Sequence, residues 1–157
     1  AEGRETVSAP INSAASAGNM AGRLDRGRVR DSAFVLQHLD DERVSVIDAR
    51  SRARFLAQAP EPRPGVRGGH IPNSLSLPFT EVLDGYRFKP VSELEAKFRH
   101  LGTNLQPGDG HQLVFSCGSG ITACIILLAA ELAGYDQLSL YDGSWADWGS
   151  DDSLPVA

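Results

Sequence analysis

The chain has 157 residues, enough for one domain with a sizeable hydrophobic core, and its 41% apolar and 22% charged residues are typical of a globular protein. A net charge of -5 argues against a nucleic-acid-binding protein, because binding phosphates requires a basic face. The longest apolar stretch, residues 121–130, is too short to span a bilayer, so we expect a buried helix there and no membrane segment.

The start of the chain differs in composition from the rest. Residues 1–22 are rich in Ala, Ser and Gly and show no hydrophobic period, whereas the pattern changes from Arg23 onward. This composition predicts a linker or tail over residues 1–22, followed by a single domain over residues 23–157.

The first half of the domain alternates short apolar stretches with turn-forming residues. Three Pro and three Gly between residues 60 and 69 indicate a loop. The elements predicted around this loop are a helix capped by Asp31 that runs to Leu39, a buried strand over residues 44–48, a helix over residues 52–57, a strand over residues 75–77 and a short helix over residues 79–83.

The second half continues the alternation. Its predicted elements are a helix from a Ser92–Glu95 capping box to about His100, a turn over residues 107–110, a strand over residues 112–116, a helix over residues 121–133 ended by Gly134, a strand over residues 138–141 and a Trp-bearing segment over residues 142–149. Strands that alternate with helices predict an α/β fold, with a mostly parallel central sheet and helices on both faces.

Cys117 lies where such a sheet binds ligands, just beyond the carboxyl end of a strand and before a helix. The glycines after it let successive backbone N–H groups point inward, and the helix adds its positive end. Such a loop stabilises an anion, so we expect a Cys117 thiolate nucleophile of lowered pKa that is able to carry a persulfide. The residues of the loop are Cys117, Gly118, Ser119, Gly120, Ile121 and Thr122.

The second cysteine, Cys124, lies in the apolar helix, where a buried bystander is favoured over a resolving thiol. Two cysteines form no disulfide framework and have no metal-ligand spacing, so we expect a reducing compartment, either the cytoplasm or the mitochondrial matrix, and no metal or cofactor. We interpret His70 as a structural histidine, Asp48 as the cap of the next turn, and Trp145 and Trp148 as packing residues.

Arg54 and Arg63 lie on either side of the proline-rich loop, which follows the carboxyl end of another strand. Two guanidinium groups at that place would clamp a carboxylate. The residues alone favour equally a solvated helix position for Arg54. A phosphatase with the pattern C-x5-R is excluded, because Ala123 stands where the phosphate-binding arginine is required.

Four motifs occur together in an order that resembles rhodanese-type sulfurtransferases, from about Asp31 to Gly149. The cysteine loop is similar to that of the 3-mercaptopyruvate sulfurtransferases, whereas two-domain thiosulfate sulfurtransferases carry basic residues where Gly118 and Ser119 stand. The resemblance implies a three-layer rhodanese-like fold. The motifs are Asp48-Ala49-Arg50, Gly69-His70-Ile71-Pro72, the Cys117 loop and Tyr141-Asp142-Gly143-Ser144-Trp145.

The resemblance also implies a reaction. Sulfur from 3-mercaptopyruvate would pass through a Cys117 persulfide to cyanide or to a thiol such as thioredoxin or a small thiol, and pyruvate would be released. Ser119 would polarise the transferred sulfur or relay a proton, and Arg54 and Arg63 would bind the substrate carboxylate. The alternatives are a thiosulfate sulfurtransferase and a non-catalytic rhodanese-like binding module.

The resemblance finally implies a partner domain. The family usually has two rhodanese-like domains, with the catalytic cysteine in the second, and residues 1–4 resemble the end of a first domain that runs into a linker. We therefore expect an N-terminal rhodanese-like domain outside this chain. That domain would supply polar side chains to the active-site cleft.

Overall fold

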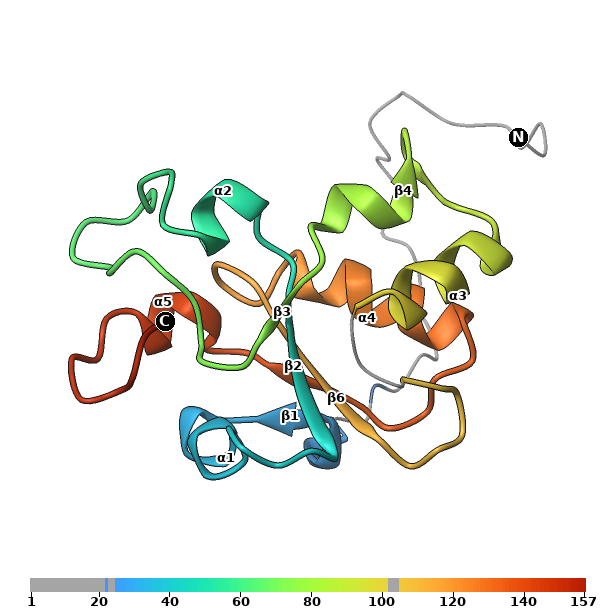
Figure 1. Ribbon diagram of the computed structural model, residues 1–157, viewed down its shortest axis with the longest axis horizontal. Helices are drawn as coiled ribbons and strands as arrows, with labels where there is room; N and C mark the ends of the chain where they lie inside the picture. Colours follow the sequence, from blue (N-terminus) through green and yellow to red (C-terminus); the bar gives the residue numbers. More distant parts are fainter. Residues whose placement is uncertain (1–21, 23–24, 102–104) are drawn as a thin grey trace, which may run out of the picture.

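A five-stranded parallel sheet forms the centre of the computed structural model, which describes residues 22, 25–101 and 105–157 (Figure 1). The strand order is β1-β7-β6-β2-β3, and all four neighbouring pairs are parallel. The predicted mostly parallel sheet is confirmed. The strands are β1 (Val29–Arg30), β2 (Val44–Asp48), β3 (Leu75–Ser76), β6 (Gln112–Ser116) and β7 (Leu138–Tyr141).

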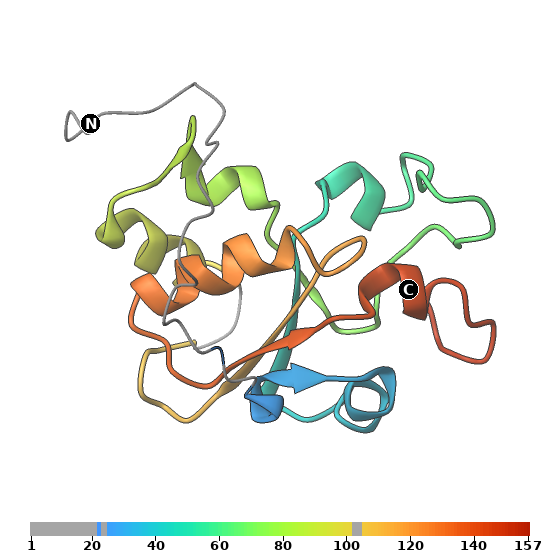
Figure 2. The same ribbon diagram turned by 180° about the vertical axis from the view of Figure 1, so that it is seen from behind.

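Helices cover both faces of this sheet, as the views from the two sides show (Figures 1 and 2). Side chains of α3 and α4 pack with the inward residues of one face, and those of α1 and α5 pack on the other face. The three-layer fold is therefore as predicted. The helices are α1 (Ser32–Gln37), α2 (Arg52–Phe55), α3 (Val91–Arg99), α4 (Ala123–Leu132) and α5 (Ser144–Trp148).

The central strands β2 and β6 place the site. Their register pairs Asp48 with Ser116, so both strands end at the same level of the sheet. Along β6, Leu113 and Phe115 enter the core under α4, while Val114 enters the core on the opposite face. This alternation fixes the strand between the two layers, and Cys117 follows directly at its carboxyl end.

Helix α4 begins at Ala123, two residues later than predicted, because Ile121 and Thr122 still belong to the turn that follows Gly120. The helix ends as expected, since Gly134 takes a positive φ of 86° directly after the C-cap. The Ser92–Glu95 capping box is wrong. Helix α3 begins at Val91 after Pro90, without a side-chain cap.

Several short elements differ from the prediction or were absent from it. The helix over residues 79–83 is a 3-10 helix, η2 (Phe79–Val82), and α2 ends earlier than residue 57. The chain after η2 forms an antiparallel hairpin of β4 (Leu83–Asp84) and β5 (Arg87–Phe88). Strand β1 and the 3-10 helix η1 (Arg26–Arg28) were also not predicted. Such short strands are too brief to show a period.

The tail predicted over residues 1–22 lies outside the described residues except for Gly22, so the domain boundary stays a prediction. Within the described part of the chain, every helix is too short or too polar to cross a membrane.

Candidate active site

Cys117 is buried, with 2% of its surface exposed, in a loop that is hydrogen-bonded to helix α5. The backbone N–H of Trp145 donates to the Cys117 carbonyl at 2.9 Å, and that of Ala146 donates to the Gly118 carbonyl at 2.9 Å. With these carbonyls directed toward α5, the Ser119 N–H donates to the Cys117 Sγ at 3.4 Å. The loop therefore presents backbone donors to the sulfur.

The pKa of the Cys117 thiol lies below its ordinary value. Burial raises this pKa, but the hydrogen bond from the Thr122 hydroxyl and those from the backbone N–H groups of Ser119, Ala123 and Thr122 lower it by more in sum. The direction agrees with the anion-stabilising loop expected from the sequence. A larger thiolate fraction is what a nucleophilic cysteine requires.

Arg54, from α2, lies against this loop. Its Nη2 is 3.0 Å from the point where a Cβ on Gly118 would be, so a side chain at that position has no room unless Arg54 moves. The guanidinium donates from Nε and Nη2 to the two carboxylate oxygens of Glu61, at 3.2 and 2.5 Å. Arg54 is therefore not the solvated helix residue that the sequence left open.

A hollow of about 240 Å³ next to the Cys117 loop brings four of the predicted site residues together. Arg54, Arg63, Gly118 and Ser119 all line it. A larger hollow of about 570 Å³ includes Gln112 and Leu138, the first residues of β6 and β7, and so lies at the opposite end of the sheet from Cys117. Since ligands of parallel sheets bind beyond the carboxyl ends, the smaller hollow is the candidate site.

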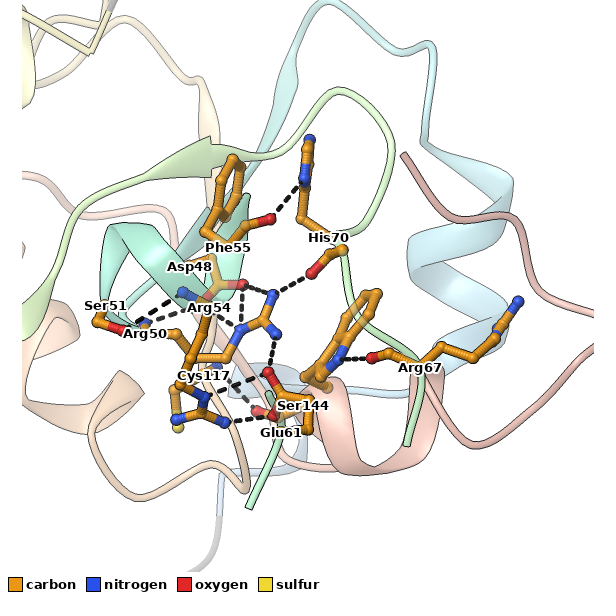
Figure 3. Close-up of polar contacts among 12 residues, drawn as sticks. Asp48, Arg50, Ser51, Arg54, Phe55, Glu61, Arg67, His70, Cys117 and Ser144 are labelled. Atoms are coloured by element: carbon orange, nitrogen blue, oxygen red, sulfur yellow. Dashed lines mark hydrogen bonds and ion pairs between the residues drawn. The ribbon is translucent and has the colours of Figure 1, made fainter. Parts of the chain in front are cut away.

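Arg54 is the last of four charged side chains that form a continuous chain of ion pairs, Asp48, Arg50, Glu61 and Arg54 (Figure 3). Arg50 is fully buried and donates to Asp48 Oδ2 at 2.8 Å and to Glu61 Oε1 at 2.9 Å. Its guanidinium also donates to the Gly69 carbonyl and lies 4.4 Å from the ring centroid of Trp145. The sequence reasoning gave Arg50 and Glu61 no role.

Residues 32–151 match the family model of the Rhodanese-like domain. The chain belongs to the rhodanese family. It is 41% identical over 122 residues to 3-mercaptopyruvate sulfurtransferase of Escherichia coli (strain K12), covering 78% of this chain and 42% of that protein. It is 39% identical over 129 residues to thiosulfate sulfurtransferase of Cricetulus griseus, covering 80% of this chain and 41% of that protein.

A solved structure agrees with this assignment. The crystal structure of Tum1 protein from Saccharomyces cerevisiae superimposes with a TM-score of 0.68 at 32% identity, over 78% of this chain and 43% of that one. The rhodanese chain thus spans less than half the length of these relatives.

In this rhodanese domain Cys124 is exposed, so its predicted burial is wrong, whereas its role as a bystander stays a prediction. Because α4 begins only at Ala123, Cys124 lies in its first turn, with Sγ donating to the Gly120 carbonyl at 3.4 Å. Partial burial and the nearby charges of Cys117 and Asp142 raise the pKa of the Cys124 thiol.

The structural roles predicted for other residues are confirmed. His70 shares a hydrogen bond of 2.9 Å between Nδ1 and the Phe55 carbonyl, and its ring stacks on Phe55 at 3.8 Å. Asp48 caps the next turn by accepting the Arg50 N–H at 2.8 Å. Trp145 and Trp148 are buried packing residues.

Ser144 is a supporting residue of the rhodanese loop that sequence reasoning missed. It is fully buried, takes a φ of 51°, accepts the Cys117 N–H at 3.1 Å and donates to the Tyr141 carbonyl at 2.9 Å. A non-glycine residue at positive φ is uncommon and marks a position fixed by its surroundings. The described residues contain no cluster of three or more His, Cys, Asp or Glu able to hold a metal.

Proposed function

We propose that this rhodanese domain is a sulfurtransferase that takes sulfur from 3-mercaptopyruvate onto Cys117 as a persulfide and passes it to a thiol or cyanide. The observation that carries the proposal is a Cys117 thiol of lowered pKa directly before the neutral Gly118-Ser119 segment, which lines one hollow together with Arg54 and Arg63. The relative named 3-mercaptopyruvate sulfurtransferase in Escherichia coli supports the choice of donor.

The reaction balances as a two-step transfer. The Cys117 thiolate attacks the substrate sulfur, an S–S bond forms, and the C–S bond breaks with its electron pair moving to carbon as the enolate of pyruvate. The proton of the substrate thiol returns to that enolate, and we assign its relay to the Ser119 hydroxyl, since Ser119 lines the hollow. An acceptor thiolate then attacks the outer sulfur and restores the Cys117 thiolate.

The charges fit this donor. The negative charge of 3-mercaptopyruvate is on a carboxylate remote from the sulfur, where Arg54 and Arg63 line the hollow. Arg63 is exposed and makes no ion pair with any residue the structure describes, so its charge is open to a substrate. Thiosulfate has charge beside its transferred sulfur and would require cations in the loop itself, where Gly118 and Ser119 are neutral.

A thiosulfate donor is the second candidate, because the thiosulfate sulfurtransferase of Cricetulus griseus is nearly as similar to this chain. The two donors are separated by measuring both rates on the same preparation. A strong preference for thiosulfate would reject the 3-mercaptopyruvate proposal.

The direct test is mass spectrometry of the chain after treatment with 3-mercaptopyruvate. We expect the mass of one sulfur atom to be added to wild type and to a Cys124→Ser control, and to be absent from Cys117→Ser. If Cys117 gains no sulfur, even when the chain is joined to its partner domain, the domain is a binding module.

The surroundings of the reaction are also part of the proposal. The chain covers 42% of its Escherichia coli relative, which leaves room in the whole protein for the N-terminal rhodanese-like domain expected above. A thiol acceptor such as thioredoxin or a small thiol, and the cytoplasm or mitochondrial matrix as compartment, suit a cysteine that must stay reduced between turnovers.

A further inference from the structure

Glu61 occupies an unusual place for a glutamate. Its side chain is only 4% exposed, although it lies in the proline-rich loop. One oxygen accepts from both Arg50 Nη1 at 2.9 Å and Arg54 Nε at 3.2 Å, and the other accepts from Arg54 Nη2 at 2.5 Å. Figure 3 shows the carboxylate between the two guanidinium groups. The two contacts with Glu61 fix the orientation of the Arg54 guanidinium.

The chain of ion pairs begins on a rigid element. Asp48 is the last residue of β2, the strand beside β6, and it holds Arg50 through Oδ2 at 2.8 Å. Arg50 in turn holds Glu61, and Glu61 holds Arg54. A free arginine loses about 2 kcal/mol of rotamer entropy when it is ordered. Here that ordering precedes ligand binding.

The position of Arg54 is limited from the opposite side as well. Its Nη2 lies 3.0 Å from the point where a Cβ on Gly118 would be, so the guanidinium fits between Glu61 and the Cys117 loop because position 118 has no side chain. Nη1 has no hydrogen-bond partner among the described residues, and Nη2 uses one of its two N–H groups for Glu61. The remaining N–H groups are left for a ligand in the hollow that Arg54 lines.

The charges of the four groups cancel. Asp48 and Glu61 each contribute one negative charge, and Arg50 and Arg54 each contribute one positive charge. Arg54 therefore offers a carboxylate directed N–H groups rather than uncompensated charge. For such a group, orientation decides the strength of the interaction.

We propose that Glu61 is a positioning residue: it clamps Arg54 against Gly118 so that the remaining N–H groups of Arg54 meet a substrate carboxylate beside Cys117. The proposal deepens the proposed function and rests on its carboxylate clamp. Glu61 touches no reacting atom and acts only through Arg54.

The test compares two alkylating reagents that need no sulfur transfer. In 3-bromopyruvate, bromine stands where 3-mercaptopyruvate carries sulfur, whereas bromoacetone lacks the carboxylate. In each case the Cys117 thiolate forms a C–S bond and bromide leaves. The rate of Cys117 alkylation by 3-bromopyruvate, divided by the rate with bromoacetone, measures how much the carboxylate helps to position the reagent. The full chain is used with Cys124→Ser, because the Cys124 thiol is exposed and would also react.

We expect Glu61→Gln to lower this ratio roughly tenfold, the loss of a well-aligned hydrogen bond to a charged group. Arg54→Ala should lower the ratio by at least as much, and adding Glu61→Gln to Arg54→Ala should change it less than about twofold, because the two residues act as one unit. Glu95→Gln removes a carboxylate from an exposed ion pair with Arg99 and should leave the ratio unchanged.

Equal slowing of both reagents by Glu61→Gln, or additive effects in the double variant, would overturn the positioning role. Wild type without any preference for 3-bromopyruvate would overturn the carboxylate clamp and the positioning role together. Should Glu61→Gln unfold, since Arg50 then loses a partner, Glu61→Asp keeps the charge but shortens the reach to Arg54; an unchanged ratio in that variant would overturn the proposal.

Discussion

At the scale of single residues, the pKa of the Cys117 thiol reflects a few hydrogen bonds that oppose the effect of burial. Burial alone would raise the pKa of a 2%-exposed thiol, yet the net pKa is lowered. The Thr122 hydroxyl is the largest contribution that lowers it, ahead of each backbone N–H group. We therefore expect the Thr122 side chain, five residues after Cys117, to affect the reactivity of this thiol.

The first prediction removes that hydroxyl. Thr122→Val keeps the shape of the side chain but loses the donor, so the pKa of Cys117 should rise and the thiolate fraction at neutral pH should fall. The rate of alkylation by iodoacetamide, measured against pH, should shift to higher pH and fall several-fold near neutrality. Thr80→Val is the control, because Thr80 is exposed and lies outside the site. An unshifted profile would contradict the assignment.

The second prediction concerns the uncompensated arginine. Because Arg63 makes no ion pair among the described residues, Arg63→Ala should weaken binding of the donor carboxylate, which raises KM for 3-mercaptopyruvate while kcat changes little. A loss of roughly tenfold in kcat/KM corresponds to one charge-assisted hydrogen bond. Arg43→Ala, at an exposed place outside the hollow, is the control. An unchanged KM would exclude Arg63 from the clamp.

Residues of the site were predictable where the signal is local. Cys117, its glycines and Thr122 are consecutive, so their place between a strand and a helix could be inferred from the sequence. Ser144 was not assigned, because its hydrogen bond to the Cys117 N–H joins residues 27 positions apart. The expected burial of Cys124 failed because α4 is apolar on all sides, so its sequence did not mark the exposed face on which Cys124, Leu128 and Leu132 lie.

At the scale of elements, the unit proposed to perform the chemistry consists of β6, the Cys117 loop and α4, and α5 supports it through hydrogen bonds to the loop. The loop turns through Gly120, whose φ is 82°, and a Cβ there would lie 2.9 Å from the Asp142 carbonyl oxygen. Gly134 ends the same helix at a similar φ of 86°, but a Cβ there would meet nothing closer than 3.7 Å. The two glycines share a backbone conformation and differ in their surroundings.

The third prediction uses this matched pair. Gly120→Ala and Gly134→Ala should each lose about 1 kcal/mol of unfolding free energy from backbone strain. Only Gly120→Ala should also displace the loop, raise the pKa of Cys117 and reduce alkylation by iodoacetamide. Urea unfolding and alkylation rates measure the two effects separately. Equal alkylation rates in both variants would show that the Asp142 contact does not shape the loop.

The elements also show where sequence patterns end. The strands β2 and β6 were predicted to the residue, and the long apolar pattern of α4 gave its ends to within two residues. The hairpin of β4 and β5 has two residues in each strand, so no alternation exists to detect. The failed capping box at Ser92 shows a second limit, because Pro90 already starts helix α3.

At the scale of the whole molecule, groups that are distant in sequence come together at the carboxyl ends of the central strands. The end of β2 supplies Asp48 and Arg50, the proline-rich loop supplies Glu61, and α5 supplies Trp145 against the Arg50 guanidinium. The sequence indicated the fold and the end of the sheet at which the site lies. It did not indicate the ion-pair chain, because that chain depends on how a loop without a period packs back onto the sheet.

The last prediction tests whether the buried ion pairs of Arg50 with Asp48 and Glu61 stabilise the fold. Arg50→Met keeps much of the volume of a fully buried side chain but leaves Asp48 and Glu61 without their shared cation. Removing one partner of a buried ion pair costs about 3–5 kcal/mol, so urea unfolding should show a loss of that size. Arg99→Met breaks an exposed pair with Glu95 and should cost less than about 1 kcal/mol. Equal losses in the two variants would show that the Arg50 pairs stabilise the fold no more than a surface contact does.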